Sequence, residues 1–291
     1  MDAGPLRDLL TAVAGFLTGA LSGAFGVGGA VISTPAIRAL GVPASLAVGT
    51  TLPSILPSAA AGALRYRREG LIDRQAVLLT VPVGLVAAVA GAVASERVPG
   101  DGHLLMLLTS ALLAVTAVRM ARHEPAQART ALAPARRSPD DGADPGPTAL
   151  VPAETGDPAP AAPHHGRGRA PAFAAVGAAA GLLSGLLGVG GGIVMVPGFT
   201  QVAGLSIKSA IATSLVCVAA LAVPGTVTHA VLGNIDWRAA AFLTLTVIPG
   251  SRLGVAATLR ASDRALRTTV AGLLGAVAVL YAGGELVSLL R

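Results

Sequence analysis

Long stretches without charged residues dominate the chain, and shorter segments between them carry most of the arginines. Apart from one interruption in each of the last two, the uncharged runs are Leu9–Ile37, Ala39–Leu64, Gln75–Ser95, His103–Val118, Ala170–Ile207, Ser209–Ile235, Ala239–Leu259 and Thr268–Leu290. Because about 20 apolar residues cross a bilayer as a helix, most of these runs have the length of one span. The pattern predicts an all-α integral membrane protein with about eight transmembrane helices.

The first and fifth runs, Leu9–Ile37 and Ala170–Ile207, are too long for one span and too short for two. Each has a glycine cluster near its middle and a proline soon after it, Pro35 or Pro197. Each glycine destabilises a helix by about 1 kcal/mol. Open backbone is tolerated at membrane depth only where protein or water satisfies it. We therefore expect each segment to be a broken helix that either crosses once or returns to its own side.

The composition changes between the two groups of runs. Residues 121–170 are rich in Pro, Ala, Gly, Asp and Arg and lack aromatic residues, so they bury too little apolar surface to order themselves. We interpret them as a flexible linker between a first transmembrane repeat, residues 1–120, and a second, residues 171–291. His164 and His165 lie in this linker, and we interpret them as solvated loop residues rather than metal ligands.

The two groups of runs resemble one another in sequence. GFLTGALSGAFGVGGAVISTPAI begins at Gly15, and GAAAGLLSGLLGVGGGIVMVPGF begins at Gly177. With one inserted residue the match continues, since AVGTTL meets AIATSL and an Ile-Asp pair ends at Asp73 in one copy and Asp236 in the other. Duplicated halves with interrupted segments at matching positions indicate the binding site of a secondary transporter. The alternative is a duplicated bundle packed by small residues, which we prefer for the outer glycines because they recur every four residues.

Composition and charge narrow the class of protein. The chain is 53% hydrophobic and only 12% charged, whereas soluble domains carry about 25% charged residues. This excludes an ordinary soluble enzyme, a disordered protein and a nucleic-acid module, although the net charge is +6. Cys217 is the single cysteine, so neither a disulfide nor a cysteine metal site is expected within the chain. The N-terminus lacks a cationic lead, and we expect the first apolar run to stay as an anchor.

The second half resembles the TauE/SafE family of sulfite exporters. The family has a glycine-rich segment, to which GLLSGLLGVGGGIVMVP is similar. The helix that follows it resembles AIATSL, and a later turn resembles GNIDW. The first half departs at Ala30, where the second copy has Gly192, and at Arg74, where it has Trp237. The resemblance covers everything except the linker. It implies a non-enzymatic, multi-pass permease of the bacterial cytoplasmic membrane that moves sulfite, a sulfonate or a related organosulfur or organic acid.

An anion inside a bilayer has to meet positive potential, and helix N-termini supply it through free N–H groups without a formal charge. A helix that restarts after the glycines would turn such groups toward the middle of the membrane, and glycine permits the close approach and the positive φ. Repeat-paired hydroxyls could donate further hydrogen bonds, or could bond their own helix carbonyls instead. The predicted substrate-binding residues are Gly26, Gly28, Gly29, Gly188, Gly190, Gly191, Gly192, Ser22, Ser184, Thr50, Thr51, Thr213, Ser214 and Arg252.

Four titratable residues are open to a functional or a structural interpretation. Arg252 interrupts the seventh run and could be a counter-ion to the anion, or it could snorkel to an interface. His229 could relay a proton for coupled transport, but we favour an interfacial histidine or a core histidine with its hydrogen bonds satisfied. Asp73 and Asp236 follow turns that contain glycine, and we predict them to be helix N-caps rather than ligands.

The predicted partners are a small anionic solute and the lipid bilayer, with H⁺ or Na⁺ as candidate coupling ions. No nucleic acid, metal or cofactor is expected. An anion channel on the same scaffold, and a membrane enzyme or assembly protein without transport, are the alternative functions. If each broken segment crosses once the halves are parallel, and if each returns to its own side they are inverted; loop charges do not decide between these. We favour inverted halves because they suit alternating access.

Overall fold

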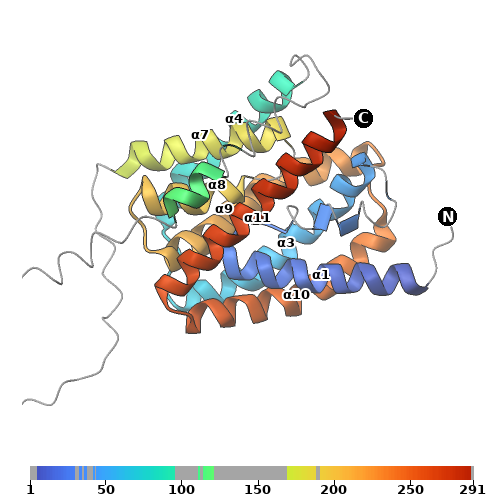
Figure 1. The fold of residues 1–291 in the computed structure, drawn as a ribbon, viewed down its shortest axis with the longest axis horizontal. Coiled ribbons are helices and arrows are strands. Elements are labelled where there is room, and N and C mark those ends of the chain that lie inside the picture. The colour runs from blue at the N-terminus through green and yellow to red at the C-terminus, as the bar shows by residue number, and fades with distance from the viewer. Residues whose placement is uncertain are drawn as a thin grey trace, which may run out of the picture. The chain divides into compact units, whose positions relative to one another are not determined.

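The computed structural model describes residues 5–29, 33–34, 36–37, 42, 44–95, 111, 114–120, 169–187 and 191–289, and the regular structure in this part is helical (Figure 1). Its helices are α1 (Pro5–Phe25), α3 (Ala44–Arg68), α4 (Arg74–Ser95), α7 (Ala170–Leu187), α8 (Gly192–Gln201), α9 (Ile207–Val231), α10 (Trp237–Arg260) and α11 (Asp263–Leu289). Residues 121–168 of the predicted linker, with its two histidines, lie outside the described residues, as does most of the run His103–Val118.

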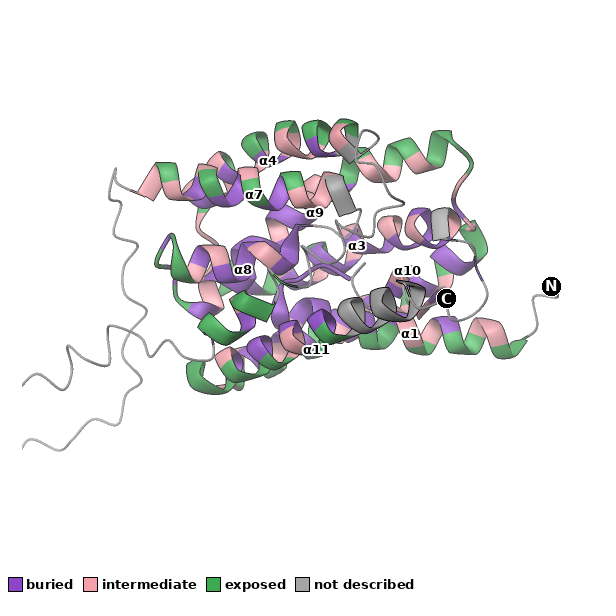
Figure 2. Ribbon diagram, turned by 45° about the horizontal axis from the view of Figure 1, so that its top comes forward, coloured by how far each residue is buried: buried purple, intermediate pink, exposed green. Residues whose placement is uncertain are grey.

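Five helices of the described part are long and apolar enough to cross a membrane. They are Pro5–Phe25, Leu46–Arg68, Arg74–Gly91, Ile207–Val231 and Trp237–Arg260. Exposed residues recur along these helices (Figure 2). Large apolar residues are among them, such as Leu78, Val86 and Leu245. A soluble monomer rarely exposes apolar surface on this scale, whereas lipid accepts it. The prediction of a multi-pass, all-helical membrane protein is confirmed at this level.

The two long runs are broken where their glycines lie. α1 ends at Phe25, α7 ends at Leu187, and α8 begins at Gly192. The guanidinium of Arg169, beside the start of α7, donates to the Gly204 carbonyl oxygen at 3.1 Å. Since Gly204 lies just after α8, the chain enters through α7 and comes back through α8 to the same end of the bundle.

Contacts between glycines and leucines fix the relative directions of α3 and α9. A Cβ built on Gly62, late in α3, would lie 2.6 Å from the Leu215 side chain, early in α9. Conversely, a Cβ on Gly225, late in α9, would lie 3.3 Å from the Leu52 side chain, early in α3. The two helices are therefore antiparallel, and the two contacts exchange when the sequence repeat is applied.

A second pair of contacts, which we call the crossed hydrogen bonds, also exchanges when the sequence repeat is applied. The Asp73 backbone N–H donates to Thr213 Oγ1 at 3.1 Å, and the Asp236 N–H donates to Thr50 Oγ1 at 2.9 Å. Both aspartates also cap helices: Asp73 Oδ1 accepts from the Ala76 N–H, and Asp236 Oδ1 accepts from two first-turn amides of α10. The N-cap prediction is confirmed for both residues.

Small residues let α1 lie beside α10 and α4 lie beside α7 (Figure 1). A methyl group on Gly19 would collide with the Val247 carbonyl, and one on Gly181 would collide with the Gly84 carbonyl. In each pair, contacts later in one helix involve residues later in the other helix, so the two helices of a pair are parallel. The packing interpretation of the outer glycines is confirmed.

The bundle has two ends with different charge. One end holds the turn between α3 and α4, and we call it the Asp73 end. At this end α7, α9 and α11 begin and α10 ends. The opposite Asp236 end holds the starts of α1, α3 and α10. In the described part, the basic residues of the Asp73 end are Arg65, Arg67, Arg68, Arg74, Arg169, Lys208, Arg260, Arg264 and Arg267. At the Asp236 end, Arg7 pairs with Asp236 at 3.5 Å and Arg238 pairs with Asp8 at 2.6 Å.

Candidate functional site: two converging glycine breaks

The first break follows α1, where Gly26 and Gly28 adopt positive φ angles of 65° and 76°. Residues with a Cβ pay about 1–2 kcal/mol to adopt this conformation, which explains the glycines. A Cβ on Gly28 would also lie 2.7 Å from a Val218 methyl group. The whole turn through Gly29 is buried, and no described residue accepts a hydrogen bond from the amides of Val27, Gly28 and Gly29.

The second break lies against the first. α8 starts at Gly192, its N-cap Gly191 has no capping side chain, and its first bonded amides are those of Val194 and Met195. The amides at the very start of α8 therefore have no partner among the described residues. A methyl group on Gly192 would collide with the Val27 carbonyl and would lie 2.8 Å from Val218. Two segments far apart in the sequence thus meet at one buried point beside α9.

Two buried hydroxyl groups lie in the last two turns of α1, just before the first break. Thr18 and Ser22 lie one turn apart on α1, each is 1% exposed, and neither hydroxyl has a partner in the described part of the chain. A Cβ on Gly29 would lie 2.6 Å from the Thr18 methyl group. An unsatisfied buried polar group costs about 1–3 kcal/mol. Such a cost is expected where a ligand supplies the missing partner.

Four of the other five predicted hydroxyls, those of Thr50, Thr51, Thr213 and Ser214, already have partners. Ser214 Oγ donates to the Gly26 carbonyl at 2.9 Å and so holds the first break against α9. Thr51 Oγ1 lies 3.1 Å from Thr34 Oγ1 and 3.0 Å from the Val48 carbonyl. Thr50 and Thr213 accept the crossed hydrogen bonds from Asp236 and Asp73. These two therefore tie the turns of one half to the helices of the other.

Arg252 is not brought to the glycine breaks. It is exposed and lines a cavity of about 530 Å³ together with Arg65, Arg68 and Glu69 near the end of α3. Ser184 is half-buried on α7. His229 is half-buried near the end of α9, and its buried Nδ1 lies 2.9 Å from the position of a Cβ on Gly49. This Nδ1 has no hydrogen-bond partner among the described residues, so the structure does not bear out a satisfied core histidine.

Two of the predicted site residues, Gly188 and Gly190, lie outside the described residues. Two buried hydroxyls without a described partner, those of Thr18 and Ser58, were missed by the sequence analysis. Thr18 was missed because its repeat-paired position holds Ala180, so the duplication does not mark it. Its spacing of four residues from Ser22 on one helix face was the available signal. Within the described residues no group of three or more His, Cys, Asp or Glu side chains could hold a metal ion.

The amides and hydroxyls that meet here, which have no partner among the described residues, are hydrogen-bond donors and include no cation. Glycine turns and helix N-termini form concavities that attract negative charge, and a buried site strengthens each donor because water is excluded. With apolar spanning helices around it, this arrangement defines a membrane transport protein that presents N–H and O–H donors at its centre.

The comparisons with known proteins agree with that class. The family described as "Sulfite exporter TauE/SafE" matches residues 11–281, and the chain belongs to this family. A "Probable membrane transporter protein YunE" of Bacillus subtilis (strain 168) is 23% identical over 259 residues, which are 84% of this chain and 85% of the relative. A "Probable membrane transporter protein" of Xylella fastidiosa (strain 9a5c) is 24% identical over 276 residues, 94% of each chain. No solved structure matches.

Proposed function

We propose that the protein is a secondary transporter that moves a small anion, such as sulfite, a sulfonate or a related organic acid, across the bacterial cytoplasmic membrane. The observation that carries the proposal is the buried contact between the two glycine breaks, at Val27 and Gly192. The proposed anion-binding groups are the amides of both breaks and the hydroxyls of Thr18 and Ser22, which have no partner among the described residues. No formal charge is needed at the site, because the N-terminus of α8 supplies about half a positive charge and the amides of the first break add further donors.

We further propose that eight hydrophobic segments form two inverted halves, residues 1–120 and 171–291, joined by the linker. Three observations support this arrangement. α3 and α9 are antiparallel, the crossed hydrogen bonds exchange under the repeat, and the α7–α8 hairpin returns to its own end. Inverted halves permit alternating access, since exchanging the conformations of the two halves exposes the same site to the opposite side.

The anion would cross by successive opening of the two ends. The site is buried, so this structure corresponds to a closed state. The crossed bonds Thr213–Asp73 and Thr50–Asp236 lie at opposite ends, and breaking one of them would free one pair of helix ends at a time. Coupling to H⁺ or Na⁺ would make the movement uphill, and the direction would follow the ion gradient.

Flux into proteoliposomes tests the proposed function. The purified full-length protein is reconstituted, and labelled sulfite, taurine and acetate are offered under imposed pH or Na⁺ gradients. We expect saturable flux of at least one anion that depends on one gradient. Absence of flux for all three under every gradient would contradict transport. Non-saturable flux that ignores both gradients would instead indicate an anion channel.

Two hydroxyl substitutions test the site itself. Thr18→Val and Ser22→Ala together remove two donors, and a hydrogen bond to a charged group contributes about 1.5–3 kcal/mol, so we expect flux to fall at least tenfold at low substrate. Thr226→Val is the matched control, because the Thr226 hydroxyl donates to the carbonyl of Ala222 in its own helix. Equal flux in the double variant and the control would rule out these hydroxyls as ligands.

A further inference from the structure

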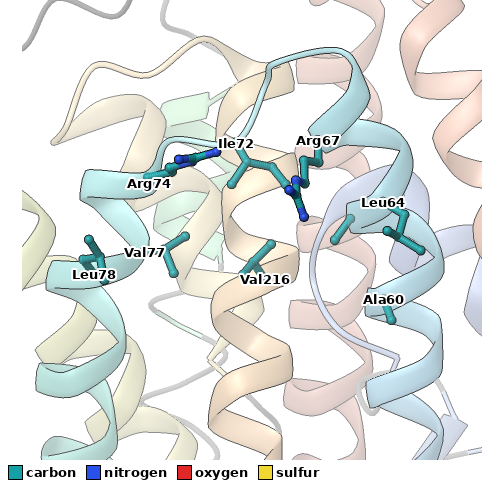
Figure 3. Close-up of a pocket in the computed structure, with 9 residues that line it drawn as sticks. Ala60, Leu64, Arg67, Ile72, Arg74, Val77, Leu78 and Val216 are labelled. Atoms are coloured by element: carbon teal, nitrogen blue, oxygen red, sulfur yellow. The ribbon is translucent and has the colours of Figure 1, made fainter.

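A cavity of about 680 Å³ lies at the Asp73 end, between the end of α3, the start of α4 and α9 (Figure 3). Its walls are apolar, and they include Leu64, Val77, Leu78 and Val216. Leu64 and Leu78 are 59% and 72% exposed, so the cavity opens on the outer surface of spanning helices, where lipid covers them. It includes none of the residues of the glycine breaks and is separate from the proposed transport site.

Two arginines close one end of this cavity. Arg67, in the last turn of α3, and Arg74, in the first turn of α4, lie at its upper end, above Val77 and Val216 and on either side of Ile72 (Figure 3). Both are exposed, and the side chain of neither forms a hydrogen bond or an ion pair with another described residue. Two unpaired guanidinium groups at the rim of an apolar cavity select an amphipathic ligand with a negatively charged head.

We propose that this cavity binds an anionic phospholipid from the leaflet at the Asp73 end. The lipid phosphate lies between Arg67 and Arg74, and one acyl chain lies along Leu64, Val77 and Val216. Arginine suits the phosphate because its planar guanidinium can donate two parallel hydrogen bonds. Basic pockets between transmembrane helices bind lipid head groups in the same way. A free inorganic anion would use only the rim and leave the apolar walls exposed.

A lipid in this cavity would lie beside the crossed hydrogen bond of the Asp73 end. Ile72 lines the cavity and adjoins Asp73, whose amide donates to Thr213. A bound lipid therefore contacts the turn between α3 and α4 and stabilises the closed form of this end. The proposal needs only that the protein lies in a membrane, so it stands or fails separately from the proposed transport.

Native mass spectrometry of the detergent-purified full chain tests this proposal. The protein is titrated with phosphatidylglycerol or phosphatidylcholine, and the bound lipids are counted. We expect one phosphatidylglycerol to bind in clear preference to phosphatidylcholine. Arg67→Gln with Arg74→Gln should weaken it about 25-fold, because each basic residue near an anionic surface contributes about a factor of five. Arg260→Gln with Arg264→Gln makes the same change of charge at the same end, away from the cavity, and should bind normally.

A second variant separates the cavity from the charges. Ala60 lines the cavity and is exposed, so Ala60→Phe fills the space without disturbing the core and leaves both arginines in place. We expect it to lose the lipid as well. Equal affinity for both lipids, equal loss in the two arginine pairs, retention in Ala60→Phe, or displacement of the lipid by millimolar inorganic phosphate would each overturn the proposal.

Discussion

At the scale of single residues, the site depends on backbone shapes that only glycine takes easily. Gly28 combines a positive φ with close contact to Val218, whereas Gly70 has a positive φ of 66° and nothing near the position of its Cβ. Substitution of Gly70 therefore has only the conformational cost of the positive φ, which is confined to the turn. Substitution of Gly28 has this cost and a packing cost as well, because the new side chain would push α9 away from the break.

We predict that Gly28→Ala lowers the stability of the protein clearly more than Gly70→Ala does. Both substitutions pay about 1–2 kcal/mol for the left-handed conformation, and Gly28→Ala also forces Val218 to move. Apparent melting temperatures in detergent measure the difference. A Gly28→Ala variant as stable as Gly70→Ala would show that the break is not packed as described.

At the scale of helices, hydrogen bonds between the two halves hold the turns. Thr50 and Thr213 are buried and accept from the amides of Asp236 and Asp73. We predict that Thr50→Val and Thr213→Val each lower the free energy of unfolding by about 1–3 kcal/mol, because each leaves an amide unsatisfied. The losses should add in the double variant, since the two bonds lie at opposite ends.

Thr228→Val is the control for these substitutions, because its exposed hydroxyl donates only to the Pro224 carbonyl within α9. Thermal unfolding followed by tryptophan fluorescence or by circular dichroism gives the comparison. If the two threonine variants unfold at the temperature of Thr228→Val, the crossed bonds do not stabilise the turns.

The helices and their breaks could be predicted from the sequence, but the contacts between helices and between the two breaks could not. Charge-free runs and glycine clusters mark spans and breaks locally, and the N-caps at Asp73 and Asp236 follow from local turn chemistry. By contrast, the pairing of α1 with α10, and the contact of Gly192 with Val27, depend on which helices cross. Hydrophobic periodicity carries no such information. The same limit explains why Thr18 was missed and why Arg252, predicted at the site, lies at an outer cavity instead.

At the scale of the whole molecule, charge predicts the orientation in the membrane. The Asp73 end carries nine of the thirteen described basic residues, whereas Arg7 and Arg238 at the other end are paired with aspartates. By the positive-inside rule, we predict that the Asp73 end faces the cytoplasm. This places the turn between α10 and α11 inside, as inverted halves require.

Cysteine accessibility measures this orientation. In a Cys217→Ala background, Ser262→Cys at the Asp73 end and Leu232→Cys at the Asp236 end are both at exposed positions. We expect an impermeant thiol reagent to label the second in intact cells and the first only after permeabilisation. Labelling of both from outside would contradict the directions of the helices, and the reverse pattern would contradict the orientation.

The most direct test is the stoichiometry of anion binding to the purified protein. If the two breaks line one site, equilibrium dialysis with labelled sulfite, or with whichever anion is transported, should find one anion per chain. Gly28→Ala and Gly192→Ala should each weaken that same binding, while Gly70→Ala should leave it unchanged. Two independent anions per chain, or binding that survives both substitutions, would contradict a site shared by the two breaks.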